Sequence, residues 1–340
     1  MERKRTFYVL DFLKNFFKWH NVPMMIYLIV NLLFIYLGTM MLTQLYISFF
    51  AGDHSLPISL TSTEYYVITA AVIAGVYFIA LVLSLSPIGE WILRKKLHCN
   101  IIEDTDIQNR IIPIFDEVYS AALRESSSVS DHVRIFIQAS DDPNAFAVGR
   151  RTVCITTALL AYSDEEIKGV LAHEFGHLAH KDTDLCLVVN IANWLTNIIF
   201  LGVWALLFLI RLMMKLLTVV VALLGENIAA LASSLVEIIF TAFAFLCVTL
   251  FQKLWLIVGN LLLLATSRGN EYKADEFALR LGYQDGLLGF FYTLPDAVEG
   301  HRNTFKKILE AIATVGATHP ATWKRIAAIK KLSNARIAVY

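Results

Sequence analysis

The sequence has little charge for its length. Of its 340 residues, 17% are charged and 57% are hydrophobic, which is more apolar than an ordinary soluble globular protein. This composition excludes a disordered polypeptide. Lys plus Arg total 29 and Asp plus Glu total 29, and no basic tract stands out. The chain therefore lacks the electrostatic footprint of a nucleic-acid-binding protein, and we expect no nucleic acid partner.

Cysteine is also scarce. The chain has 4 cysteines, which are widely spaced and form no CxxC pair. This spacing excludes a disulfide framework and a cysteine metal site, and it predicts buried thiols at Cys99, Cys154, Cys186 and Cys247.

Long apolar runs are abundant. Residues 22–50 and 65–88 carry no charged side chain, and as helices each is long enough to cross the roughly 30 Å hydrocarbon layer. A third apolar region, residues 185–266, is interrupted by charged residues, among them Arg211, Lys215, Glu237 and Lys253. We therefore predict a mainly α membrane protein.

The charges that flank the first two runs orient them. Residues 51–64 contain no Lys or Arg, whereas basic residues precede the first run (Arg3, Lys4, Arg5, Lys14, Lys18) and follow the second (Arg94, Lys95, Lys96). The positive-inside rule places both ends of this hairpin in the cytoplasm. The first run is far longer than a signal core and a second follows, so we expect no cleavable signal. The residues before it form either an interfacial amphipathic helix or a plain lead-in.

Residues 97–184 have an ordinary composition and predict a small sheet beside helices. Apolar residues recur at helical spacing over 104–123, and they alternate over 133–137 as in a half-buried strand. A turn follows at 141–144, and 151–157 is typical of another strand. Ser163 and Glu166 form a capping box, which predicts a helix from Asp164 to His180.

This helix contains an H-E-x-x-H motif, from His173 to His177. The four-residue spacing places both imidazoles on one helix face, so both can bind one zinc ion. Glu174 lies beside that face, where it can take a proton from a water molecule that the zinc activates. The motif predicts peptide-bond hydrolysis.

Zinc needs a third protein ligand. His180 lies a turn too far along the helix, and His180 and Thr183 stand where the longer three-histidine motif requires Gly and His. Glu271 and Asp275 stand one helical turn apart in a later polar segment, so they can supply a ligand and a carboxylate that orients an imidazole. From the residues alone, Glu271 can equally be ordinary solvated charge.

Four blocks, in this order, resemble the HtpX-like integral-membrane zinc metalloproteases. They are Asn144-Ala145-Phe146-Ala147, the motif at 173–177, the segment from Ser267 to Asp275, and Thr318-His319-Pro320 through Arg325-Ile326. The resemblance implies about four transmembrane helices plus a small α+β gluzincin-like domain. It also implies one Zn²⁺ per chain held by His173, His177 and Glu271, with Glu174 as general base and Asp275 orienting His173.

The resemblance also suggests roles for the outer blocks. Asn144, Ala145, Phe146 and Ala147 match a substrate-aligning edge, although by themselves they are a turn entering a strand. His319 either donates to the oxyanion or begins a helix that Arg325 anchors.

One shared zinc ion constrains the topology. If His177 and Glu271 bind the same ion, the chain between them crosses the bilayer an even number of times, and two crossings that turn near 225–227 fit best. Arg211 and Lys215 then snorkel, pair with Glu226 or Glu237, or mark an inward-facing polar surface. We divide the chain into a lead-in and hairpin (1–92), a first catalytic part (93–184), a second hairpin (185–266) and a second catalytic part (267–340).

We therefore expect a multi-pass zinc metalloendopeptidase of the bacterial cytoplasmic membrane, with its catalytic site facing the cytoplasm. Its expected substrates are polypeptides, chiefly membrane or misfolded proteins, in membrane-protein quality control. A prenyl-peptide (CAAX-type) zinc protease is one alternative, and the span count discriminates it. A catalytically inert scaffold or transporter is another, and zinc stoichiometry discriminates that.

Overall fold

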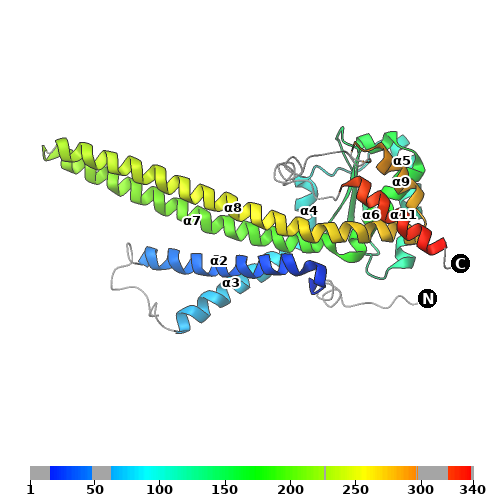
Figure 1. The fold of residues 1–340 in the computed structure, drawn as a ribbon, viewed down its shortest axis with the longest axis horizontal. Helices are drawn as coiled ribbons and strands as arrows, with labels where there is room; N and C mark the ends of the chain where they lie inside the picture. Colours follow the sequence, from blue (N-terminus) through cyan, green and yellow to red (C-terminus); the bar gives the residue numbers. More distant parts are fainter. Residues whose placement is uncertain (1–15, 48–62, 226, 296, 298–320, 338–340) are drawn as a thin grey trace. The chain divides into compact units, whose positions relative to one another are not determined.

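A computed structural model describes residues 16–47, 63–225, 227–295, 297 and 321–337. Most of the lead-in, with its predicted amphipathic helix, lies outside these residues, as do Glu226 and His319. The described residues form two compact units, shown as ribbons in Figure 1. Unit 1 comprises Met1–Met25, Ile79–Val189 and Leu261–Tyr340, and unit 2 comprises Ile26–Phe78 and Asn190–Asn260. The predicted division into four segments stays a prediction.

Four described helices are long and apolar enough to cross a membrane. They are α2 (Val22–Tyr46), α3 (Thr63–Ser84), α7 (Asp182–Leu223) and α8 (Asn227–Leu281), and the candidate span within α8 is Ile228–Gly259. At about 1.5 Å per residue, α7 and α8 are each at least twice as long as the hydrocarbon layer is thick. The prediction of a mainly α protein with four spans is confirmed.

The second apolar run ends earlier than its composition predicts. Helix α3 stops at Ser84, and a separate helix, α4 (Pro87–Lys96), follows. The Ser86 side chain accepts a hydrogen bond from the Gly89 amide at the start of α4, where proline is tolerated because the first amides of a helix have no partner. Ile88 therefore belongs to α4.

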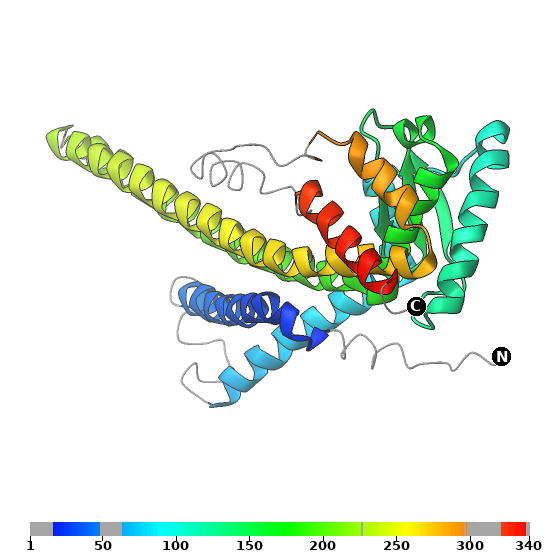
Figure 2. The ribbon, with the colours of Figure 1, turned by 45° about the vertical axis from the view of Figure 1, so that its right-hand side comes forward.

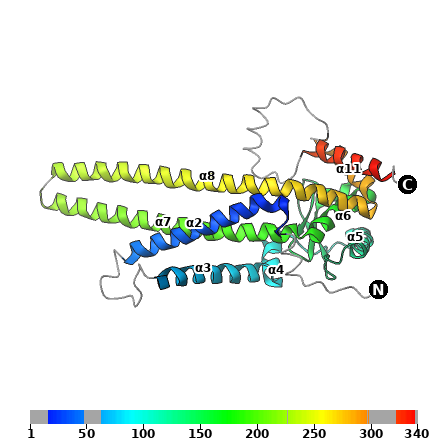
Figure 3. The ribbon, with the colours of Figure 1, turned by 60° about the horizontal axis from the view of Figure 1, so that its bottom comes forward.

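Polar side chains join the helices of unit 2. Figures 1 and 3 show α7 and α8 side by side in this unit. The Arg211 Nε lies 3.2 Å from the Glu237 Oε1, and the Thr218 and Ser233 hydroxyls are 3.0 Å apart. Such contacts are a usual means of association between membrane helices. Of the alternatives for Arg211, pairing with Glu237 is the one observed.

The sheet of unit 1 has three strands in the order β1-β3-β2. Strand β1 (Arg134–Gln138) is parallel to β3 (Thr152–Thr156), and β2 (Ala145–Val148) pairs antiparallel with β3. The strands predicted at 133–137 and 151–157 are confirmed. Residues Asn144 to Ala147 are therefore largely an edge strand, which leaves one side of β2 free of strand pairing.

The two faces of the sheet pack in different clusters. Ala145, Val153 and Ile155 belong to the main core, together with α5 (Thr105–Glu125) and α6 (Asp164–His180). Cys99, Phe136, Val148 and Cys154 form a smaller cluster, against which Phe146 packs. The prediction of buried thiols holds for Cys99 and Cys154 but is wrong for Cys247, which lies exposed on the apolar surface of α8.

Helix α6 is the centre of unit 1. It begins at the predicted capping box, and it packs against α5, β2 and α9 (Gln284–Thr293). Gly169 of α6 and Gly286 of α9 face backbone atoms of the other helix so closely that neither site has room for a Cβ. Figure 2 shows α9 in orange beside α11 (Thr322–Ile337) in red, which completes the unit. A buried helix in this position holds its side chains rigidly.

Candidate metal centre

Two helices bring the predicted zinc ligands together. His173 and His177 lie one turn apart on α6, and Glu271 comes from the part of α8 that belongs to unit 1. One ligand atom from each residue lies within 4.8 Å of the other two. The two Nε2 atoms are 3.1 Å apart, and each lies 3.4 Å from an oxygen of Glu271.

These distances suit a single zinc ion. Ligand atoms about 2.0–2.1 Å from a tetrahedral centre lie roughly 3.3 Å from one another. The donor set of two imidazoles and one carboxylate is also one that catalytic zinc sites use, with a fourth position left for water or substrate. The residues present therefore fit the metal that the motif implies.

A carboxylate holds each imidazole. The His173 Nδ1 lies 2.9 Å from Asp275 Oδ1, and the His177 Nδ1 lies 3.0 Å from Asp182 Oδ2. A carboxylate on Nδ1 fixes the tautomer and leaves Nε2 free to bind a metal. The structure thus supports the predicted contact of Asp275 and adds an equivalent partner for His177.

Asp182 is the site residue that the sequence analysis missed. It lies five positions after His177, which on a continuous helix would be off the ligand face. Helix α6 ends at His180, and Lys181 adopts a left-handed conformation with φ 60°. Lysine rarely takes this conformation, so a lysine at position 181 does not predict the sharp turn that returns Asp182 to the site.

Arg325 of α11 also lies in the site. Its guanidinium donates to Asp275 through Nη2 at 2.6 Å and Nε at 2.9 Å, and its Nη1 lies 3.0 Å from Glu271 Oε2. The guanidinium carbon also lies 4.3 Å from the centre of the Phe291 ring on α9. Arg325 therefore anchors α11, as predicted, and it does so by contacting the site residues Asp275 and Glu271.

Burial and charge shift the site's acid–base equilibria. Burial alone would lower the pKa of both imidazoles, and the Arg325 charge acts the same way on His173. Hydrogen bonds to carboxylates outweigh this, so the pKa of His173 is raised and that of His177 lies well above its usual value. Burial would raise the pKa of Asp275, but Arg325 lowers it. The site thus keeps Asp275 ionised as a permanent acceptor.

Glu174 lies between the ligands and the edge strand. It is 5% exposed, and its Oε2 accepts a hydrogen bond of 2.8 Å from the Ala147 amide of β2. The Asn144 carbonyl accepts from the Thr156 amide and hydroxyl, and Phe146 packs in the smaller cluster on the opposite face of the sheet from Ala145. Among residues 144–147, Ala147 is therefore the one whose backbone hydrogen-bonds to Glu174.

His180 lies apart from the ligands. Its ring packs edge-on against Phe277, with 6.1 Å between the ring centroids, and it does not belong to the His173, His177 and Glu271 group. Burial lowers the pKa of His180 to about 4. This agrees with the expectation that His180 is not a ligand.

Comparison with known proteins gives a consistent result. The family model described as peptidase family M48 matches residues 108–333. The chain is 27% identical over 257 residues to Protease HtpX of Shewanella baltica, which covers 72% of this chain and 81% of that protein. It is 27% identical over 211 residues to a Protease HtpX homolog of Bacillus licheniformis, covering 59% of this chain and 60% of the other. A crystal structure of S. mikatae Ste24p aligns with 17% identity and a TM-score of 0.38, over 85% of this chain and 61% of that one.

Proposed function

Since the chain belongs to peptidase family M48, we propose that it is a zinc-dependent enzyme that cleaves internal peptide bonds of membrane or misfolded proteins. The chain is an integral membrane protein and a metalloendopeptidase. The observation that carries the zinc proposal is the convergence of His173, His177 and Glu271, whose ligand atoms all lie within 4.8 Å of one another. When bound, zinc would polarise the scissile carbonyl and lower the pKa of a water molecule to about 7.

Glu174 is the general base in this proposal. Its carboxylate takes a proton from the attacking water and passes it to the leaving amine. Its contact with the Ala147 amide fixes it between the ligands and β2, where a peptide laid along the strand would be cleaved. Asp275 and Asp182 hold His173 and His177 with Nε2 toward the ion.

The edge strand β2 is the substrate-aligning element. Its side away from β3 is unpaired by any described strand, so an extended peptide can add to it through backbone hydrogen bonds. Backbone pairing selects an extended conformation and leaves the side-chain sequence largely free, which suits an enzyme that cleaves misfolded polypeptides. Asn144, at the start of the strand, would hold the backbone of the substrate.

The flanking charges support a catalytic site on the cytoplasmic side. Basic residues precede α2 and end α4, whereas the segment between α2 and α3 has none. Helices α7 and α8 supply two candidate spans between His177 and Glu271, and two crossings would return the chain to the same side. We therefore infer a bacterial cytoplasmic membrane protein with an inward-facing catalytic site and a role in membrane-protein quality control.

The alternatives lose support. The described residues contain four candidate spans, fewer than a larger, chamber-forming prenyl-peptide protease would need. Charged residues within membrane helices can mark a transport pathway, but Arg211 and Glu237 form an ion pair with each other. A structural ion pair in a membrane helix needs no transport function to explain it.

The test is metal content together with cleavage of casein or a membrane protein in detergent. Glu174→Gln is expected to retain one zinc per chain and to lose roughly 100-fold or more of the activity, the range for removal of a general base. Glu271→Ala is expected to lose zinc itself. Glu165→Gln, on the exposed start of the same helix, is the matched control and should keep both.

Two results would contradict the assignments. Cleavage at the wild-type rate by zinc-loaded Glu174→Gln would remove Glu174 as the base. Unchanged zinc content in Glu271→Ala would remove Glu271 as a ligand.

A further inference from the structure

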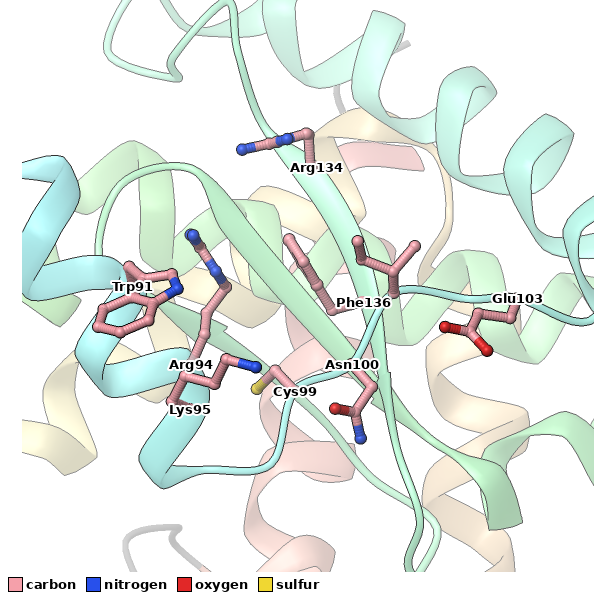
Figure 4. A pocket seen from close by; sticks show the side chains of 9 residues that line it. Trp91, Arg94, Lys95, Cys99, Asn100, Glu103, Arg134 and Phe136 are labelled. Carbon is pink, nitrogen blue, oxygen red and sulfur yellow. The ribbon is translucent and has the colours of Figure 1, made fainter.

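A cavity lies in unit 1 between α4, the segment that follows it, and β1. Its volume is about 560 Å³, and Figure 4 shows the side chains around it. Its lining is basic and aromatic at one side: Trp91, Arg94 and Lys95 come from α4, and Arg134 and Phe136 come from β1. None of these residues belongs to the metal centre.

Positive charge is concentrated around one aromatic ring. The guanidinium carbons of Arg94 and Arg134 lie 5.0 Å and 6.0 Å from the centre of the Phe136 ring. Two cations held on one ring repel each other, and an anion between them would remove that cost. Guanidinium groups also match the oxygen geometry of phosphate.

The structure holds one of these cations firmly and leaves the others available. Arg94 donates to the Thr152 hydroxyl at 3.1 Å and lies 3.7 Å from Glu90, so its position is fixed and its charge partly balanced. Lys95 and Arg134 are exposed and have no acidic partner among the residues that the structure describes. Glu103, the acidic member of the lining, lies beyond Asn100 from Arg94 in Figure 4. The basic side therefore keeps a net positive charge.

Helix α4, which lines this cavity, closely follows a candidate membrane span in the sequence. It begins three residues after Ser84, the end of the candidate span α3. Ile88, Trp91 and Ile92 recur at helical spacing on α4, and each is more than half exposed. A short helix with exposed tryptophan and isoleucine, ending in basic residues next to a span, is typical of the headgroup layer of a bilayer.

We infer that this cavity binds the phosphate headgroup of an anionic membrane lipid. The acyl chains would lie against the apolar residues of α4, and the phosphate would lie between Arg134 and Lys95, with Arg94 behind it. The basic cluster that ends α4 indicates the leaflet that carries anionic lipids, which attract such segments. This site is independent of the proteolytic function proposed above.

The experiment is calorimetric titration of the full-length protein in neutral detergent. The probes are short-chain phosphatidylglycerol, short-chain phosphatidylcholine and inorganic phosphate. We expect saturable binding of phosphatidylglycerol and none of the other two. The variant Lys95→Gln/Arg134→Gln should weaken that binding about 30-fold, the loss expected for two cations at an anionic surface.

A matched control separates the site from general charge. Lys96→Gln/Arg124→Gln removes the same charge from exposed positions outside the lining, and it should bind phosphatidylglycerol like the wild type. Equal weakening in both double variants would overturn the proposal, as would unchanged binding in Lys95→Gln/Arg134→Gln. Inorganic phosphate that binds as tightly as the lipid would show that a free phosphate compound, and not a lipid, is the ligand. Zinc content and thermal unfolding confirm that each variant is folded.

Discussion

Gly176 sets the distance between the two helices that carry the proposed zinc ligands. It lies within the motif on α6, one residue before His177, and a Cβ at this position would lie 2.7 Å from the Ala274 Cα and 3.1 Å from the Ala274 carbonyl oxygen. Ala274 is on α8, between Glu271 and Asp275. The perturbation we propose is therefore Gly176→Ala, which adds a single methyl group at the crossing.

The size of the effect follows from this contact. Carbon atoms pack at about 3.5–4.0 Å, so α8 must move away by roughly 0.8 Å or more. Zinc–ligand distances tolerate only about 0.2 Å, so Glu271 cannot follow α8 without weakening its bond. Overpacking lowers the free energy of unfolding by about 1–3 kcal/mol, whereas replacing glycine by alanine within a helix raises it by about 0.5–1 kcal/mol. The middle of each range leaves a net loss of about 1.3 kcal/mol, which corresponds to zinc binding roughly 10-fold weaker.

The assay is competition for zinc between the purified protein and a chelator of known affinity, combined with thermal unfolding with and without zinc. Gly75→Ala is the control, because no atom lies within 4 Å of the Cβ that it adds to α3. We expect Gly176→Ala to bind zinc more weakly and to unfold earlier, and Gly75→Ala to bind zinc like the wild type and to unfold no earlier. Wild-type zinc affinity and wild-type unfolding in Gly176→Ala would refute the claim that this glycine fixes the ligand distance.

Three further predictions test the surroundings of the site. Asp182→Asn should weaken zinc binding about 10- to 100-fold, because it removes the carboxylate that contacts His177 Nδ1. The same chelator competition measures this affinity, and an unchanged affinity would contradict the role of Asp182. Arg325→Leu should lower the free energy of unfolding, measured in denaturant, by about 3–5 kcal/mol, because it leaves Asp275 buried without its cation. The control is Lys330→Leu at an exposed position of the same helix, and an equal loss in both variants would contradict the importance of the buried ion pair. Burial lowers the pKa of His180 to about 4, below the value near 6.5 of an unfolded histidine, so the unfolded chain takes up this proton more readily than the folded chain. The contribution of neutral His180 to the free energy of unfolding is therefore complete above about pH 6.5 and is lost as the pH falls toward 4. When the pH is lowered from 7 to 4.5, the free energy of unfolding should therefore fall less for His180→Phe than for the wild type, as measured by denaturant unfolding. An equal fall in both proteins would show that His180 does not contribute.

Local signals predicted much of the fold. The helix from Asp164 to His180 has the predicted limits, because a capping box and a helical pattern act within a few residues of each other. The strand containing Ile135 and Ile137 was likewise visible as alternation. Strand β2 was less visible, because its residues are few and its place at the sheet edge depends on pairing with β3.

The site could be predicted only in part. Spacing on one helix is enough to pair His173 with His177, but Glu271 required the resemblance to known proteases, since an acidic residue on a helix is more often solvated. The contact of Asp182 could not be predicted, because it depends on the left-handed conformation of Lys181. Arg325 was known only as an anchor without a partner, because its partner Asp275 is 50 positions away in the sequence.

The sequence by itself determined which segments can enter a bilayer and which helix carries the paired histidines, and it predicted which ends face the cytoplasm, since these inferences depend on composition and on neighbours within a few residues. Tertiary structure alone decided that Asp182 holds His177, that Arg211 pairs with Glu237 and that Arg94 and Arg134 share one ring. Each of these contacts depends on a chain reversal or on packing between separate elements. The energies of these contacts depend on burial and on distance, and neither quantity can be predicted from the residues that are neighbours in the sequence.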